Sequence, residues 1–354
     1  MSASVPVSAR PTGLVNGFLF LATVLTTTAT GALHVHADGR IAPIADGLPF
    51  SVPLLAILLC HEFGHYFAAR RHGVPASLPY FVPLPPWFGF LGTMGAVIRM
   101  PESPADRRKL FDIAVAGPLA GLVVAIPVLI YGLSKSPVLP MSPLALQEGN
   151  SLLYLGLKYL QTGRWLPDGV YDVQLHPTAF AGWAGLLLTM LNLLPFGQLD
   201  GGHAMVARFG NTYPGLSVRL HKLMLVFAVG AFAFTYVVTS RAIAAGGMPT
   251  DGQGTPLLSP GELALSAGMF WVLWFAVVRL LRRLGGGVEH PPVESVPLGR
   301  VRKAVFVLVS LLFVSIFMPI PVRVSVGPPV VGPGPASAKV LGSQASPPPT
   351  SPKP

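Results

Sequence analysis

Two histidines and one glutamate stand in this sequence at the spacing of a metal site. They form the motif His61-Glu62-x-x-His65 within an apolar run. On a helix, positions i and i+4 share one face, so both imidazoles can converge on a single metal ion. Glu62 lies on a neighbouring face, from which its carboxylate can reach a water molecule beside the ion. The pattern predicts two neutral nitrogen ligands and one general base.

The surroundings of this motif strengthen the prediction. The motif alone occurs by chance in many helices, but here FSVPLLAILLC precedes it and YFAA follows it. Buried histidines and carboxylates need partners, and an ionisable cluster at membrane depth indicates a functional site. Cys60, the only cysteine, directly precedes His61 and could ligate as a thiolate. A small buried residue is the better interpretation of Cys60.

A later apolar stretch supplies a third ligand. Residues 189–203 read TMLNLLPFGQLDGGH, in which proline and glycine break the helix next to Asp200. Asp200 lies near the inner end of its span, where a carboxylate requires a cation or a metal. Arg70 marks the inner end of the helix that carries the histidines, and it follows His65 by about 7–8 Å along that helix. The histidine pair therefore lies at a depth similar to that of Asp200. Two histidines and an aspartate leave the fourth coordination position of a tetrahedral ion open, and this set predicts a catalytic zinc site.

Other interpretations stay open around this break. Asp200 could cap a helix over 202–209, although the depth match with the histidines favours ligation. His203 could support a metal ligand through a hydrogen bond or lie at the membrane interface, and we favour the interface. Zinc fits two histidines and an aspartate, and another divalent ion is also compatible.

The composition indicates a polytopic membrane protein. Of 354 residues, 51% are hydrophobic and 11% are charged, against about 25% charged in soluble domains. A net charge of +10 would suggest a nucleic-acid partner in a soluble protein. Here the excess of basic residues in cytoplasmic segments of membrane proteins explains it. We therefore expect the lipid bilayer, and no nucleic acid, as a partner.

Seven apolar stretches approach the roughly 20 residues that span a bilayer. They are 14–33, 50–69, 111–133, 179–197, 217–239, 262–281 and 303–321. An inside N-terminus places about two thirds of the Lys and Arg residues on inner segments, and seven spans then place the C-terminus outside. The expected fold class is an all-α polytopic membrane protein with about six or seven transmembrane helices.

A proline-rich segment follows the second apolar stretch. Its prolines exclude a regular helix and are Pro75, Pro79, Pro83, Pro85, Pro86 and Pro101. We expect a re-entrant or interfacial loop, because non-helical backbone at membrane depth needs protein or water around it. Residues 89–100 contain a short β-favouring run whose open edge could pair with an extended peptide. A simple packing loop explains this run equally well.

We divide the chain into four parts. Residues 1–49 hold the N-terminal span and an outer loop, and residues 50–210 form the catalytic membrane core. Residues 211–326 supply the C-terminal transmembrane helices. Residues 327–354 are rich in Pro and Ser and read as a disordered tail. An interfacial helix is expected near 151–161.

The two motifs together resemble the site-2 protease family of intramembrane zinc metalloproteases. The resemblance rests on His61-Glu62-Phe63-Gly64-His65 and on Asn192 followed by Leu199-Asp200-Gly201-Gly202. The stretch GWAGLLLTMLNLLPFGQLDGGH is similar to the bacterial and plastid branch that lacks a PDZ domain. The resemblance covers roughly residues 50–210.

The resemblance implies a role for each matching residue. His61, His65 and Asp200 would hold zinc, Glu62 would be the general base, and Asn192 would position or stabilise the substrate carbonyl. The segment 89–98 resembles the β-segment with which the family holds an unwound substrate strand. One departure follows Pro118, where Leu119, Ala120 and Gly121 stand in place of an asparagine common among relatives.

The expected function is intramembrane proteolysis. The enzyme would be a zinc metalloendopeptidase that hydrolyses a peptide bond in or near a transmembrane segment of a membrane-protein substrate, as in regulated intramembrane proteolysis. A divalent-metal transporter is an alternative. The metal ligands of a transporter should lie at several membrane depths, whereas the candidate ligands here lie at one depth. An inactive membrane scaffold is a second alternative, against which the intact Glu62 argues. We expect a multi-pass protein of the bacterial inner (cell) membrane, with its active site toward the cytoplasm.

Overall fold

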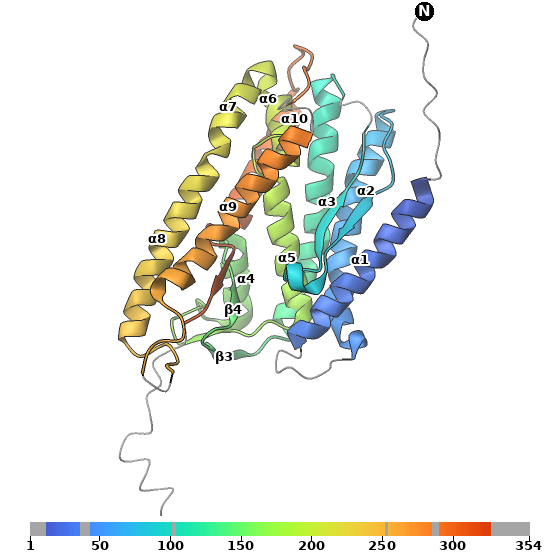
Figure 1. The fold of residues 1–354 in the computed structure, drawn as a ribbon. Coiled ribbons are helices and arrows are strands. Elements are labelled where there is room, and N and C mark those ends of the chain that lie inside the picture. Colours follow the sequence, from blue (N-terminus) through green and yellow to red (C-terminus); the bar gives the residue numbers. More distant parts are fainter. Residues whose placement is uncertain (1–11, 36–42, 101–103, 252–253, 285–289, 327–354) are drawn as a thin grey trace, which may run out of the picture.

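Long apolar helices make up most of the chain (Figure 1). The computed structural model describes residues 12–35, 43–100, 104–251, 254–284 and 290–326. Within these ranges, five segments are long and apolar enough to cross a membrane: Gly13–His34, Ile44–Arg71, Arg107–Leu133, Asp200–Ala244 and Pro260–Arg283. The predicted class, an all-α polytopic membrane protein, is confirmed.

The described residues form a succession of helices. In chain order they are α1 (Thr12–Val35), α2 (Leu48–Arg71), α3 (Arg107–Leu133), α4 (Leu152–Thr162), α5 (Pro177–Asn192), α6 (Asp200–Phe209), α7 (Tyr213–His221), α8 (Leu223–Ala244), α9 (Pro260–Leu284) and α10 (Arg300–Ile316). The strands are short and are β1 (Tyr80–Pro83), β2 (Thr93–Val97), β3 (Val138–Pro140), β4 (Leu146–Glu148), β5 (Tyr171–Val173) and β6 (Val322–Val324).

Two of the seven predicted spans are shorter helices than the sequence suggested. The stretch 179–197 corresponds to α5, which has 16 residues. The stretch 303–321 corresponds to α10, which has 17 residues and gives way to extended backbone at Phe317. Because α5 is buried along most of its length, protein rather than lipid surrounds the chain where that helix stops.

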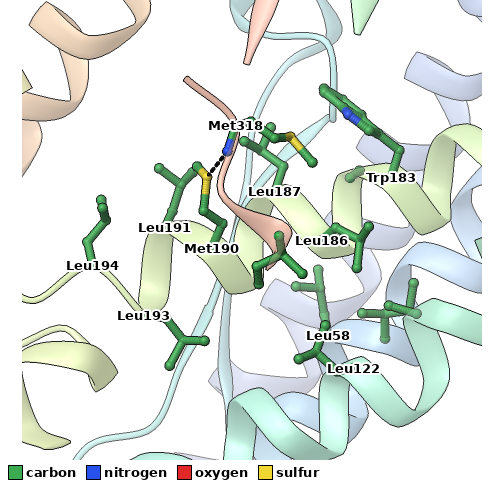
Figure 2. Packing of buried hydrophobic residues seen from close by; sticks show 14 of the residues in the cluster. Leu58, Leu122, Trp183, Leu186, Leu187, Met190, Leu191, Leu193, Leu194 and Met318 are labelled. Carbon is green, nitrogen blue, oxygen red and sulfur yellow. Dashed lines mark hydrogen bonds between the residues drawn. The ribbon is translucent and has the colours of Figure 1, made fainter. Parts of the chain in front are cut away.

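The helix α5 forms the centre of the apolar core (Figure 2). Trp183, Leu186 and Met190 on α5 are fully buried. Leu58 of α2 and Leu122 of α3 belong to the same cluster. Beside α5, the backbone N–H of Met318 lies 3.1 Å from the Met190 sulfur. The core therefore fixes the end of α5, from which the chain enters the predicted metal site.

Small residues bring the central helices close together. A Cβ added to Gly64 of α2 would lie 2.5 Å from the Ala116 carbonyl oxygen on α3. A Cβ added to Gly132 of α3 would lie 2.2 Å from the Ala179 nitrogen on α5. Glycine at such contacts lets membrane helices approach through van der Waals packing.

The proline-rich segment forms a β-hairpin: the short β-favouring run expected within 89–100 is present as β2, whereas its pairing with β1 was not predicted. The strand β1 pairs antiparallel with β2, in a register that places Tyr80 opposite Val97. Polar side chains of α1 hold this hairpin. Asn16 donates hydrogen bonds to the carbonyls of Leu78 and Pro79, and Thr26 donates to the carbonyl of Gly92. The hairpin sheet has two strands, so the far edge of β2 has no strand partner in the described part of the chain.

One end of the bundle carries a small cap. The cap, residues 134–176 with β6, contains the pairs β3–β5 and β4–β6 (bottom of Figure 1). The helix predicted near 151–161 is α4, and its position at the membrane interface stays a prediction. The division of the chain into four parts stays a prediction, and the tail 327–354 lies outside the described residues.

Substituting Gly132 tests the close contact between α3 and α5. We expect Gly132→Ala to lower stability by about 1–3 kcal/mol, because the added methyl group overlaps the α5 backbone. Gly156→Ala on α4 is the matched control, since a Cβ there meets nothing within 4 Å. Thermal unfolding of the purified protein in detergent measures both. Equal midpoints for the two variants would contradict this packing.

Candidate metal centre

The helix α2 presents the two histidines side by side inside the bundle. Both side chains are buried, and their Nε2 atoms lie 3.2 Å apart. His65 Nδ1 lies 2.8 Å from the Ile113 carbonyl oxygen of α3. Because a carbonyl only accepts hydrogen bonds, His65 Nδ1 donates, and its Nε2 turns a lone pair toward His61. A hydrogen bond of this kind orients a metal-binding imidazole.

The first residue of α6 completes a cluster of three possible ligand atoms. Asp200 Oδ2 lies 3.2 Å from His61 Nε2 and 3.2 Å from His65 Nε2. Among the described residues, this is the group of His, Cys, Asp and Glu side chains that could hold a metal ion. Ligands about 2.0–2.2 Å from a tetrahedral ion stand roughly 3.3–3.6 Å apart. The observed separations of 3.2 Å are close to these values, so the donor set and its spacing are compatible with such an ion.

A break between α5 and α6 places the Asp200 carboxylate beside the two histidines. The chain leaves α5 after Asn192 and passes Gly197, whose φ is +54°. The Tyr213 hydroxyl donates to the Pro195 carbonyl, 2.8 Å away. The Gly197 N–H donates to the Ser217 hydroxyl oxygen over 3.1 Å. Hydrogen bonds to α7 thus fix the turn between α5 and α6, and the turn places the start of α6 beside the histidines.

The capping role considered for Asp200 is absent from this turn. Leu199 is the N-cap residue of α6, and it makes no side-chain capping hydrogen bond. Asp200 stands in the first helical turn, where a negative charge is favourable to the helix dipole. Its carboxylate faces the two imidazoles instead of the backbone N–H groups.

Two glycines of α3 make room for the imidazole rings. A Cβ at Gly117 would lie 2.1 Å from His65 Nε2, and one at Gly121 would lie 3.2 Å from His61 Nδ1. The run Ala116-Gly117-Pro118 indicated close helix approach, but its contact with the ring of His65 was not apparent from the sequence. The Ile113 carbonyl carried no sequence signal, because any residue could supply it.

The structure brings both predicted catalytic residues to this cluster. Glu62 is buried, and the Ile98 backbone forms a hydrogen bond with its carboxyl group. Asn192 Nδ2 lies 3.3 Å from His61 Nε2. Cys60 is half-buried and does not belong to the three-residue cluster.

A cavity of about 300 Å³ opens onto the cluster. Besides the residues already described, its lining includes the β2 end through Ala96 and Val97, and α9 through Val278 and Leu281. His203, for which we favoured the interface, also lines this cavity, and its Nδ1 lies 2.9 Å from His290 Nε2. A chain segment entering the cavity would therefore pass between a strand edge and a helix.

Comparisons with known proteins identify a family and several relatives. The profile described as Peptidase family M50 matches residues 49–236. "Probable zinc metalloprotease EGY1, chloroplastic" from Oryza sativa subsp. japonica is 38% identical over 47% of this chain and 29% of its own length. Its namesake from Arabidopsis thaliana is 37% identical over 48% of this chain and 31% of its own length.

A third relative matches more of the chain. "Probable zinc metalloprotease EGY3, chloroplastic" from Oryza sativa subsp. indica is 28% identical over 80% of this chain and 45% of its own length. The chain thus spans less than half the length of these relatives. No solved structure matches it. Because the family profile covers more than half of the residues, including the break between α5 and α6, the chain belongs to peptidase family M50.

Proposed function

We propose that this chain is a zinc metallopeptidase that hydrolyses a peptide bond in or near a transmembrane segment of a membrane protein. The observation that carries the proposal is the convergence of His61, His65 and Asp200 among apolar helices, with Glu62 beside them. Membership of peptidase family M50 supports hydrolysis of peptides. Membrane-spanning helices around the centre support a substrate that reaches it from the bilayer.

In this proposal, His61, His65 and Asp200 hold zinc. Relatives of the chain carry zinc metalloprotease in their names. The donor set also supports the assignment, since two imidazoles and one carboxylate are a common set in catalytic zinc sites that keep a position open. When bound, zinc would supply a water of lowered pKa and polarise the scissile carbonyl.

The protein's own residues would then move the protons. Glu62 takes a proton from the attacking water and passes it to the leaving amine. Burial of Glu62 excludes bulk water that would compete for this proton. Asn192 can donate a hydrogen bond from Nδ2 toward the oxygen on which negative charge develops.

The free edge of β2 would hold the substrate in an extended form. A helical peptide carbonyl is hydrogen-bonded within its helix and shielded, so a transmembrane substrate must unwind before hydrolysis. Backbone groups on a strand edge can bind such a segment by β-augmentation. Ala96, Val97 and Ile98 line the cavity beside Glu62, which supports this edge as the docking strand.

We further propose that the metal centre lies near the cytoplasmic face of a bacterial cell membrane. Basic residues in the last turns of α2 and α9 gather at the end of the bundle that is nearest the centre (top of Figure 1). Such a bias marks the inner side of a membrane. The relatives compared above are named chloroplastic, and an inner face rich in basic residues is compatible with either membrane.

Metal content tests the ligand assignment. We expect Asp200→Asn to weaken zinc binding by more than the roughly 10–100-fold that loss of a supporting hydrogen bond costs, because an amide is a poor zinc ligand. Asp168→Asn is the matched control, since Asp168 pairs with Arg164 in the cap. Elemental analysis after dialysis against a weak chelator measures both. Full zinc retention by Asp200→Asn would exclude this carboxylate as a ligand.

Glu62→Gln tests the general base. We expect cleavage of single-span membrane proteins in detergent to fall by about 10²–10⁴-fold, because an amide cannot take the proton. Zinc content should stay at the wild-type level, since Glu62 is not a ligand. Glu294→Gln, an exposed position of the loop before α10, should cleave like wild type.

A panel of single-span substrates makes the cleavage result decisive. Cleavage that persists in Glu62→Gln would remove this residue from the mechanism. Bound zinc in the wild type, with no cleavage of any panel member and metal transport into vesicles instead, would overturn the proposed function.

A further inference from the structure

A second cavity, of about 600 Å³, lies between the cap and α8. One wall is apolar and consists of α8 residues that include Val226, Phe227 and Phe234. The residues Val226 and Phe234 are 65% and 55% exposed. The opposite wall carries the polar groups of Glu148, Asn150 and Arg323. The cavity is therefore apolar on its membrane-helix side and polar on its cap side.

The polar wall rests on a buried network of ionisable groups. The Tyr154 hydroxyl donates to Glu148 Oε1 over 2.8 Å. Behind this contact, the fully buried Lys158 pairs with Asp172, whose other oxygen accepts a hydrogen bond from Gln147. This network fixes the position of the Glu148 carboxyl group, because the Tyr154 hydroxyl donates to it and the charge of Lys158 interacts with it.

The polar wall has unfilled capacity to accept hydrogen bonds. Asn150 Oδ1 is buried and has no hydrogen-bond partner among the described residues. Burial raises the pKa of Glu148 to about 7, with the nearby charge of Asp172 adding to the shift and Lys158 opposing it. A carboxyl group and an amide oxygen at one cavity wall are complementary to an ammonium group, which donates three hydrogen bonds.

Arg323 adds a positive charge to the same wall. Its Nε donates to Gln147 Oε1 over 2.8 Å, and its charge interacts with that of Glu148. A guanidinium group binds phosphate well. The cavity thus combines an anionic group, a cationic group and an apolar wall, which matches the headgroup and acyl chain of a zwitterionic phospholipid.

The cavity also lies at a suitable distance from the metal centre. Ser217 of α7 contacts the turn next to Asp200. The helix α8 continues in the direction of α7 (Figure 1), so Phe234, 17 residues further along, lies about 25 Å away at the rise of an α-helix. The hydrocarbon core of a bilayer is about 30 Å thick. The cavity therefore lies near the membrane face opposite the metal centre.

We propose that this cavity binds an aminophospholipid of the phosphatidylethanolamine type, with its ammonium at Glu148 and Asn150, its phosphate at Arg323 and an acyl chain along α8. The site does not depend on the proposed peptidase activity. A trimethylated headgroup cannot donate the required hydrogen bonds, so the site should discriminate between two lipids that differ only in methylation.

Lipid binding to the purified, delipidated full chain in detergent tests the proposal. Native mass spectrometry would count bound phosphatidylethanolamine and phosphatidylcholine that carry identical acyl chains. We expect the wild type to prefer phosphatidylethanolamine by about tenfold or more, as hydrogen bonds to charged groups are strong. Glu148→Gln should abolish that preference. Glu262→Gln, a control at the start of α9, should keep the preference. Arg323→Gln should weaken the binding of both lipids.

A cavity-filling variant provides a second, independent test. A Cβ at Gly230 of α8 meets nothing within 4 Å, and Gly230 lines the cavity. Gly230→Leu should fold but no longer bind either lipid. Gly215→Leu, at an equally open position of α7, should bind both lipids like the wild type. Equal binding of the two lipids by the wild type, or unchanged binding by Gly230→Leu, would overturn the proposal.

Discussion

The contact among His61, His65 and Asp200 is the constraint on which the arrangement of this bundle depends. Three polar atoms, each 3.2 Å from the other two, lie among buried apolar helices. Without a cation, such a group would cost free energy, because a buried carboxylate and buried imidazoles lose their hydration. A bound divalent ion would offset that cost and would link α2 directly to α6.

Several features of the fold follow from the need to bring α6 to α2. The helix α5 stops after 16 residues, so that the turn behind it can place Asp200 at the depth of the histidines. Gly117 of α3 has no side chain because the ring of His65 occupies that space. At the rim, Asp112 of α3 accepts two hydrogen bonds from Arg302 of α10 and contacts His72 at the end of α2. These contacts link α2, α3 and α10 at the basic end of the bundle.

The sequence predicted which side chains converge better than it predicted the lengths of the helices around them. His61 and His65 were predictable because a four-residue spacing has one geometric meaning on a helix. Asp200 was predictable because a carboxylate beside a helix break in an apolar stretch needs a partner. The Ile113 carbonyl was not predictable, since backbone groups leave no mark on residue type. The break before Asp200 was predicted, but the early end of α5 at Asn192 was missed, because hydropathy does not distinguish a helix that protein surrounds from one that lipid surrounds.

The cap shows the same limit. Its short strands pair residues that are far apart in sequence, such as Gln147 with Arg323. Neither segment has enough alternation of apolar and polar residues to predict a pairing across that distance. The buried network around Lys158 therefore became visible only with the structure, although Glu148 and Asp172 stand plainly in the sequence.

X-ray absorption spectroscopy at the zinc edge of the purified protein tests the central claim most directly, because it reports the atoms around the metal without requiring a substrate. We expect nitrogen and oxygen neighbours only, at about 2.0–2.2 Å, with the outer-shell scattering of two imidazoles. A sulfur neighbour at about 2.3 Å would place Cys60 on the metal and contradict the site. Scattering from fewer than two imidazoles would contradict it as well.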